Sequence, residues 1–534
     1  MRRRSFLAAG MASLTAPRLA GAQTGGRPSS VLRVIPQADL AVLDPGITTA
    51  TVTRNHGFMI FDTLYGLNAA GEPVPEMVEG HEVADDGRSW LLRLRNGLRF
   101  HDGEPVRASD AVASLRRWAR RDPFGKTLMA ATDELSAPDD RTIQFRLKRP
   151  FPLLTLALAK TTPYTPFIVP ARLIPSDPSA PMTEMIGSGP FRFLPADRLP
   201  GARVAYARFD GYVPRQGGTA SGGEPGLSSG PKQVHFERVE WQVIPDASTA
   251  LAAIQNGEVD WWERPIPDLL PLVRRDKSLR AEITNRAGTI AFIQFNHLYP
   301  PFDNAAIRRL VLSVVDQNEF EQMISGTDPS LRGGKVGIFL PGGPMATGAG
   351  LEEMRGRRDF DALKRELAAA GYKGERVVML VGTDSPVNNA VSEVMGDLLR
   401  KMGFNLDYQA MDWGSVVQRR VNQQPPDKGG WNIFGVSADG DYFTDPTVVP
   451  AIRANGKDAW IGWPTSARVE ELYRDWFLAS DQADRQRIAR ELQVQTLREA
   501  NWIPVAQVFL PTVLRADVTG VLPGFAKFWN VRRG

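Results

Sequence analysis

GEPVPEMVEGHEVADDGRSWLLRLRNGLRFHDGEPVRASDAV, residues 71–112, predicts a β-meander followed by a helix. Asp86-Gly87 and Asn96-Gly97 are hairpin-turn dipeptides, because a type I′ turn requires positive φ at its central positions. Between them the run SWLLRLR mixes large apolar residues with arginine, as expected for a strand buried mainly on one face. A His101-Asp102-Gly103 turn follows, and Ser109-Asp110 can supply the cap of a helix.

The same stretch resembles the signature region of the extracellular solute-binding proteins of peptide and nickel ABC importers. That family has a D-G turn, an apolar strand, an R-x-G turn and an F-H-D-G turn before a helix, and each has a counterpart here. Leu43-Asp44-Pro45, the Gly187–Pro190 turn and VIPDASTALAAIQNGEVD at residues 243–260 extend the resemblance. It covers residues 43–510 and implies an α/β fold, the two-lobed clamshell of periplasmic binding proteins, type II, with the extra subdomain of the peptide-binding class.

The order of predicted elements agrees with an α/β fold. Residues 376–381 form an apolar strand, 387–402 a helix that ends before Gly403, and 405–410 another strand, so strands and helices alternate. The resemblance also implies a division of the chain, with hinge strands near 291–296 and 502–508. The expected parts are a signal peptide at 1–22, lobe I at 31–285 with an inserted subdomain at about 51–182, lobe II at 286–502, and a return to lobe I at 503–534.

The N-terminal residues predict export. Arg3-Arg4-Ser5-Phe6-Leu7 follows the twin-arginine pattern, and Ala20-Gly21-Ala22 offers a cleavage site of small residues. Removing this leader takes away four arginines and no acid, which leaves 60 of the 64 basic residues against 60 acidic ones. A nucleic-acid partner therefore loses its electrostatic support. We expect a periplasmic monomer that works with the permease subunits of the inner membrane.

The absence of cysteine excludes disulfides, thiolate metal sites, a cysteine nucleophile and a lipid-bearing cysteine anchor. The five histidines show no i, i+4 pair and no H-E-x-x-H motif, so we expect no metal and no cofactor. Nickel held through a chelator would need few histidines and stays an alternative.

Three near-matches to catalytic motifs lack their structural context. Residues 226–230, GLSSG, satisfy G-x-S-x-G, but a Gly/Ser-rich linker precedes them and Pro231 follows where a nucleophile elbow needs a strand and a helix. Gly125-Lys126-Thr127 lacks the first glycine of a phosphate-binding loop. His101-Asp102 lies in a tight turn and is expected to be structural. We therefore expect no catalytic residue.

The candidate ligand residues lie in the second half of the chain. Apolar residues 433–436 predict a buried strand that runs into Asp439, and carboxylates at strand ends are well placed to face a crevice. By the resemblance, Asp439 matches the aspartate that pairs with a peptide's α-ammonium. Trp413, Trp431, Trp460 and Trp463 can supply apolar walls, and we select Trp413 and Trp431. Asn296, near a hinge, is a further candidate for hydrogen bonds.

One departure from the family concerns the ligand carboxylate. Dipeptide-specific members carry an arginine after the strand equivalent to residues 376–381, where this chain has Thr383-Asp384-Ser385-Pro386. A buried carboxylate needs a cation, so a plain dipeptide is disfavoured. The resemblance implies capture of a peptide or peptide-like solute for an ABC importer. The alternatives are a secreted hydrolase of peptides or amides, and a receptor of the same fold for glutathione, an opine or a chelated metal.

Overall fold

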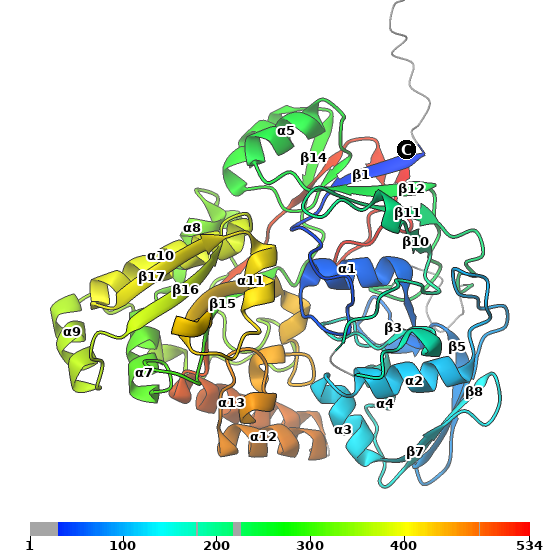
Figure 1. Cartoon of the computed structure of the whole chain (residues 1–534), viewed down its shortest axis with the longest axis horizontal. Coiled ribbons are helices and arrows are strands. Elements are labelled where there is room, and N and C mark those ends of the chain that lie inside the picture. Colours follow the sequence, from blue (N-terminus) through cyan, green and yellow to red (C-terminus); the bar gives the residue numbers. More distant parts are fainter. Residues whose placement is uncertain (1–29, 178–179, 217–225, 480) are drawn as a thin grey trace, which may run out of the picture.

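The computed structural model describes residues 30–177, 180–216, 226–479 and 481–534. The predicted leader at 1–22 lies outside these residues. Three sheets organise the described chain, and Figure 1 shows them in three regions: the yellow-green sheet at the left, the sheet around β1 at the upper right, and the cyan subdomain at the lower right. Of the described helices, none has the length and hydropathy needed to cross a bilayer.

The core of lobe I is a seven-stranded sheet. β1 lies parallel to β12 and β13, whereas the other pairings are antiparallel. The strands, in spatial order, are β10 (Phe191–Phe193), β11 (Arg203–Arg208), β12 (Arg238–Gln242), β1 (Val31–Ile35), β13 (Trp261–Trp262), β20 (Thr512–Arg515) and β14 (Leu279–Glu282). Asp246 caps α5 (Ala247–Gln255), which lies between β12 and β13 in the chain and makes a strand–helix–strand unit with them. Helix α6 (Leu270–Arg275) packs with α5 in one core cluster.

The subdomain carries the opening sequence stretch. Its antiparallel sheet has the order β5 (Val78–Val83), β6 (Ser89–Leu94), β8 (Thr142–Leu147) and β7 (Thr132–Ser136). The Asp86-Gly87 turn joins β5 to β6, with Gly87 at φ 67°, and alternate residues of β6 are buried as predicted. The apolar face of this sheet packs on α2 (Ala108–Trp118), α3 (Pro123–Ala131) and α4 (Leu154–Leu158).

Two local predictions in this stretch are wrong. Asn96-Gly97 forms a turn, but it does not join paired strands, because β6 has β8 as its second neighbour and helices α2 and α3 intervene. Helix α2 starts after Arg107, and Asp110 lies three residues inside it, where its carboxylate accepts a hydrogen bond from the Arg107 amide. Asp110 is therefore not the N-cap residue. It stabilises the start of the helix from the third helical position, by accepting the hydrogen bond of the N-cap amide.

Lobe II is built on a five-stranded sheet with the order β17 (Asn405–Met411), β16 (Arg376–Gly382), β18 (Ile433–Asp439), β15 (Thr289–Phe295) and β19 (Trp502–Val508). β16 lies parallel to β17 and β18, and β15 lies antiparallel to β18 and β19. The surrounding helices are α7 (Ala305–Val314), α8 (Gln317–Ser325), α9 (Phe360–Ala369), α10 (Pro386–Met402), α11 (Trp413–Arg419), α12 (Ala467–Leu478) and α13 (Gln482–Glu499). Gly403 ends α10 with φ 91°, as the sequence predicts.

The chain crosses between the two large sheets twice. Residues 283–288 connect β14 to β15, and residues 509–511 connect β19 to β20. The strands expected as hinges therefore belong to the sheet of lobe II, and the crossings lie beside them. The expected boundary at 285/286 falls within the first crossing, whereas that at 502/503 falls at the start of β19. Short pairs complete the fold: β2 (Asp62–Thr63) with β9 (Phe167–Ile168), β3 (Tyr65–Leu67) with β4 (Pro73–Pro75), and β21 (Val518–Thr519) with β22 (Arg532–Arg533).

Figure 1 shows helix α1 (Thr51–Ile60) between the sheet around β1 and the cyan subdomain. Its apolar residues Phe58, Met59 and Ile60 are buried in the lobe I core, while Arg54 on the same helix reaches lobe II. A second contact between the lobes joins the Phe124 ring of α3 to the Phe477 ring of α12, with centroids 5.6 Å apart. Arg54 of α1 and Phe124 of α3 are thus two points at which lobe I contacts lobe II.

Candidate functional site

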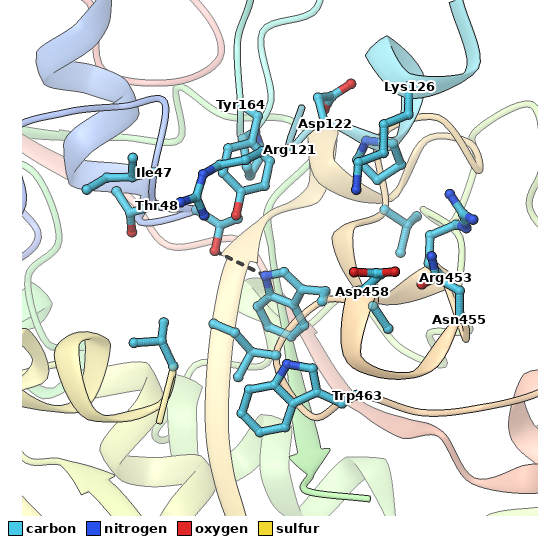
Figure 2. Close-up of a pocket in the computed structure, with 18 of the residues that line it drawn as sticks. Ile47, Thr48, Arg121, Asp122, Lys126, Tyr164, Arg453, Asn455, Asp458 and Trp463 are labelled. Carbon is cyan, nitrogen blue, oxygen red and sulfur yellow. Dashed lines mark hydrogen bonds between the residues drawn. The ribbon is translucent and has the colours of Figure 1, made fainter. Parts of the chain in front are cut away.

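A cavity of about 450 Å³ lies between the lobes. Lobe I lines it with residues 47–49, the start of α3 and residues 160–164, and lobe II lines it with residues 417–423 and 447–463. Figure 2 shows Arg121 and Tyr164 on one wall, Arg453, Asn455 and Asp458 on another, and Trp463 below them. The volume falls within the range of about 300–1,000 Å³ that is usual for small-molecule sites.

Thr49 is the point at which the two lobes meet inside the cavity. Its Oγ1 accepts a hydrogen bond from Trp460 Nε1 at 3.3 Å and another from Arg420 Nη2 at 3.3 Å. A hydroxyl has two acceptor lone pairs, so one lobe I side chain holds two lobe II side chains. Both bonds depend on the present distance between the lobes.

Basic side chains dominate the cavity wall. Seven cations face two carboxylates there: Arg120, Arg121, Lys126, Lys160, Arg420, Arg453 and Lys457 against Asp122 and Asp458. Arg120, Lys126, Lys457 and Asp458 are exposed and form the rim. The wall therefore carries a positive field, which low-dielectric surroundings strengthen.

Two of these cations are neutralised by nearby acids. Lys160 Nζ pairs with Asp122, which also caps α3 by accepting from the Gly125 amide. Arg453 pairs with Glu470, with Nη2–Oε2 at 2.5 Å, and lies over the Tyr473 ring. The positive charges of Lys160 and Arg453 are therefore largely neutralised within the protein.

Arg420 differs from both. It follows α11, whose Asp412 cap accepts from the Ser415 amide, and its side chain is 3% exposed. Its guanidinium lies 5.6 Å from the Trp413 ring centroid and 5.9 Å from that of Trp460. Burial lowers the pKa of Arg420 to about 10. Among the described residues, no carboxylate forms an ion pair with it.

A smaller annex of about 40 Å³ adjoins the cavity and shares Thr49, Pro163, Arg420 and Trp460 with it. Aromatic side chains supply much of its lining: Phe292, Trp413, Tyr442, Phe443 and Trp460. Arg420 thus stands between a larger basic space and a smaller aromatic one.

Of the predicted ligand residues Trp413, Trp431 and Asn296, the structure places one at the surface of these spaces and two behind it. Trp413 lines the annex and is 9% exposed, and the unselected Trp460 and Trp463 line the larger cavity. Trp431 and Asn296 are fully buried in lobe II, and neither borders the two spaces. Asn296 Nδ2 donates to the Trp431 carbonyl at 2.8 Å, and Trp431 Nε1 donates to the Arg420 carbonyl at 2.9 Å, so both lie behind Arg420.

Asp439 is engaged within the protein. Its Oδ2 lies 2.6 Å from Arg54 Nη2, and its Oδ1 lies 2.6 Å from Arg264 Nη2. Both arginines belong to lobe I, whereas Asp439 ends β18 of lobe II. Asp439 borders a separate space of about 40 Å³ rather than the large cavity. Its role as an amine anchor stays a prediction, and in this arrangement two guanidinium groups take the places of a ligand ammonium.

Three other residues discussed in the sequence analysis form hydrogen bonds with the backbone. Asp384 accepts a hydrogen bond from the Trp413 amide at 2.6 Å, and burial raises its pKa. Ser228 is buried and its hydroxyl accepts from the Leu67 amide at 2.9 Å. His101 accepts from the Gly187 amide through Nδ1 and contacts the Gly189 carbonyl through Nε2, so it joins two turns of lobe I.

Arg420 and Thr49 were missed as site residues. Arg420 follows Arg419 at the end of a helix, a position where exposed basic residues are common because they favour the helix dipole. Thr49 lies in a stretch, TTATVT, that shows no motif. The rim residue Lys126 of α3 is the lysine of the Gly125-Lys126-Thr127 stretch that resembled a phosphate loop, and only the fold brings it opposite residues 447–463.

Comparison with known proteins agrees with this architecture. The family model of the bacterial extracellular solute-binding proteins, family 5, matches residues 72–458. A probable peptide ABC transporter periplasmic-binding protein of Sinorhizobium fredii is 34% identical over 557 residues, which cover 99% of each chain.

Two solved structures share the fold at low identity. The oligopeptide-binding protein of Bacillus subtilis, solved with a nonapeptide, superposes with a TM-score of 0.76 at 17% identity, covering 95% of this chain and 100% of that one. A binding protein of A. tumefaciens R10 in complex with mannopinic acid gives a TM-score of 0.75 at 17% identity, with the same coverage. The two-lobed fold is thereby confirmed, and the chain belongs to the bacterial extracellular solute-binding proteins of family 5.

Proposed function

We propose that this protein is the substrate-binding component of an ABC importer and that it captures a peptide or peptide-like solute in the cavity between its lobes. The observation that carries the proposal is the cavity of about 450 Å³ whose wall comes from both lobes. A ligand there contacts both lobes at once, so it favours the closed arrangement over an open one. The peptide-transport names of the relatives support this substrate class.

Closure in this proposal is a hinge motion about the two crossings at 283–288 and 509–511. These are short connections between two separately packed sheets, and each lobe has its own apolar core. Opening would separate Thr49 from Trp460 and Arg420 without disturbing either core. The ligand-bound, closed form would then dock on the permease subunits in the inner membrane.

Export to the periplasm by the twin-arginine route, without a lipid anchor, and a monomeric state belong to the same proposal. The Arg3-Arg4 pair supports the export route, and the absence of cysteine supports the lack of a lipid anchor. Replacing both arginines with lysine should keep the protein in the cytoplasm, which cell fractionation and immunoblotting would measure. Normal periplasmic accumulation of that variant would contradict the export route.

We propose no catalytic step. Ser228 supports this, because Gly226 and Ser229 close a turn around it and its hydroxyl accepts from a backbone amide. A secreted hydrolase would require a base at that hydroxyl. Turnover of ester or peptide substrates that disappears in Ser228→Ala would overturn the binding proposal.

The experiment is native mass spectrometry of gently purified protein, followed by calorimetric titration with di- to pentapeptides, glutathione and mannopinic acid. Thr48→Trp should block binding, since Thr48 lines the cavity. Thr327→Trp, an exposed position of lobe II outside the cavity wall, is the matched control. Equal binding by both variants would place the ligand elsewhere.

A further inference from the structure

Arg420 is a buried cation that forms no ion pair with any carboxylate of the described residues. Its Nη2 donates to the hydroxyl of Thr49 at 3.3 Å, and its Nε is buried with no hydrogen-bond partner in the described part of the chain. A buried guanidinium with neither a carboxylate nor a full set of acceptors carries a large desolvation cost. A bound anion that pairs with this guanidinium would offset the desolvation cost.

Other arginines of the described chain show what a purely structural role requires. The buried Arg54 pairs with Asp439 at 2.6 Å, and the partly buried Arg117 pairs with Asp44 at 2.5 Å. Arg308 lacks a carboxylate, but its guanidinium donates to the carbonyls of Phe302, Asp303, Glu499 and Ala500. Among the residues that the structure describes, Arg420 has no comparable set of acceptors, although it is as deeply buried as Arg54 and Arg308.

Arg420 borders the space in which we propose that the ligand binds. It lines both the large cavity and the annex, and the flanking rings of Trp413 and Trp460 fix the guanidinium between them. Trp431 holds its backbone from behind through the Arg420 carbonyl. The group is therefore preorganised, and a ligand anion would not have to order it.

The rest of the wall has the same sign. With Lys160 and Arg453 neutralised by Asp122 and Glu470, the basic rim still outnumbers Asp458. A neutral or cationic solute would leave this excess uncompensated when the lobes close and exclude water. A solute with several carboxylates would balance it.

We propose that Arg420 binds a carboxylate of the transported solute and that this solute is acidic, with a net negative charge spread toward Arg120, Lys126 and Lys457. The inference rests on the proposed function and names its substrate class. The arginine that dipeptide-specific relatives place after the strand equivalent to β16 is replaced by Thr383–Pro386 here, so the cation comes from a different element, the end of α11. The carboxylates can belong to an acidic peptide or to a sugar acid.

The test is a calorimetric cycle with two proteins and two probes. The acidic tripeptide Glu-Ala-Glu is compared with Gln-Ala-Gln-amide, which has the same shape without carboxylates, on the mature wild type and on Arg420→Gln. The wild type should prefer the acidic probe by about 10- to 100-fold, as expected for hydrogen bonds to a charged group, and the variant should lose most of that preference. Mannopinic acid, titrated in parallel, distinguishes a sugar acid from a peptide as the source of the carboxylates.

Two further variants keep the result interpretable. Arg420→Lys retains the charge and should retain part of the preference even if Arg420→Gln proves unstable. Arg490→Gln removes an exposed arginine of lobe II outside the cavity wall and should change nothing. Melting temperatures of all variants establish that each is folded.

The outcomes separate this inference from the proposed function. A wild type that binds Gln-Ala-Gln-amide or Lys-Ala-Lys as tightly as Glu-Ala-Glu would overturn the acidic-solute inference and leave the receptor proposal standing. An unchanged preference in a folded Arg420→Gln would do the same. Absence of binding to every peptide and sugar acid, with no co-purified solute, would contradict both.

Discussion

Asp439 at the end of β18 and Arg54 in α1 form an ion pair between the lobes, with 2.6 Å between Oδ2 and Nη2 and side chains 5% and 3% exposed. Arg264 completes the arrangement on Oδ1. In the sheet, Asp439 lies opposite Thr289, the first residue after the 283–288 crossing. The ion pair is therefore located beside the first crossing between the two large sheets and away from the basic cavity, a position suited to fixing the lobes relative to each other.

Asp439→Asn should destabilise the folded protein by about 3–5 kcal/mol, because removing one partner of a buried ion pair leaves uncompensated charge. Here the buried guanidinium of Arg54 and the partly buried one of Arg264 would both lose their carboxylate. Urea unfolding at pH 7 measures the change. Asp397→Asn, which breaks an exposed i, i+4 pair with Lys401, is the control and should cost about 0–1 kcal/mol. Equal effects would show that the Asp439 pair contributes little.

The amine-anchor role predicted for Asp439 leads to a different outcome in the same variant. If Asp439 binds a ligand ammonium, acetylating the N-terminus of a bound peptide should weaken wild-type binding at least about 10-fold and should have no effect in Asp439→Asn. If Asp439 serves the lobe contact, acetylation should affect both proteins equally. Calorimetry with one peptide and its acetylated form decides between these roles.

Much of the fold was predictable because local signals and the resemblance agree. The alternation of residues 143, 145 and 147, the Asp246 cap and the Gly403 end of α10 each reflect a short-range rule, and each appears in the structure. The wrong predictions concern strand pairing, which depends on residues far apart in the sequence. Asn96-Gly97 is a good hairpin signal, yet the partner of β6 comes from residues 142–147, fifty residues later.

The candidate site was less predictable for the same reason. Trp413 and Trp431 lie 18 positions apart and look equivalent in sequence, but only Trp413 borders a ligand space. The carboxylate of Asp439 stands out at a strand end, whereas its two arginines lie 385 and 175 residues away. Whether a charged group is free for a ligand depends on such distant partners. For Arg420 the opposite holds: it has no charged partner among the described residues, and no neighbouring residue in the sequence shows this.

The buried histidines should make stability fall as the pH falls. Burial lowers the pKa of His101 to about 4, and His56 and His297 to about 3. An unfolded histidine has a pKa near 6.5, so between about pH 6.5 and 4 the unfolded state binds a proton that the folded state does not. Their stabilising effect is complete above pH 6.5 and is lost as the pH falls through this window.

His101→Gln provides the specific test of that prediction. The variant should reduce the dependence of the unfolding free energy on pH between 6.5 and 4 by about 1.4 kcal/mol per pH unit, the contribution of one proton. Urea unfolding at several pH values gives both curves, and comparing them cancels groups that titrate alike in both proteins. Parallel curves would show that burial does not keep His101 neutral in the folded protein.

Lys232 should be essential to the stability of lobe I. Its Nζ lies 2.6 Å from Asp62 and 3.5 Å from Glu76, and all three side chains are at most 2% exposed. Lys232→Met would leave two carboxylates buried without a cation, and the expected loss is about 3–5 kcal/mol in urea unfolding at pH 8. Burial already raises the pKa of Glu76 to about 7.

Adding Glu76→Gln to Lys232→Met should therefore recover part of that loss, because one of the two orphaned charges is removed. The matched control is Lys126→Met, an exposed lysine of the same lobe, which should unfold like the wild type. A double variant no more stable than Lys232→Met alone would contradict the assignment of Lys232 as the counter-ion of Glu76.

Gly440 should control how the lobes close. A Cβ at this position would lie 2.1 Å from the Ala287 carbonyl oxygen in the first crossing, and the Gly440 amide donates to the Gly288 carbonyl at 2.8 Å. Gly440→Ala must therefore displace the crossing, at a cost of about 1–3 kcal/mol. Because the displaced segment is one of the two crossings about which we propose that the lobes close, the closed population should fall and the apparent ligand affinity should fall in proportion. Small-angle scattering and calorimetry measure the two effects. Gly348→Ala, where a Cβ meets nothing within 4 Å, is the control, and identical behaviour of the two variants would show that the crossing does not govern closure.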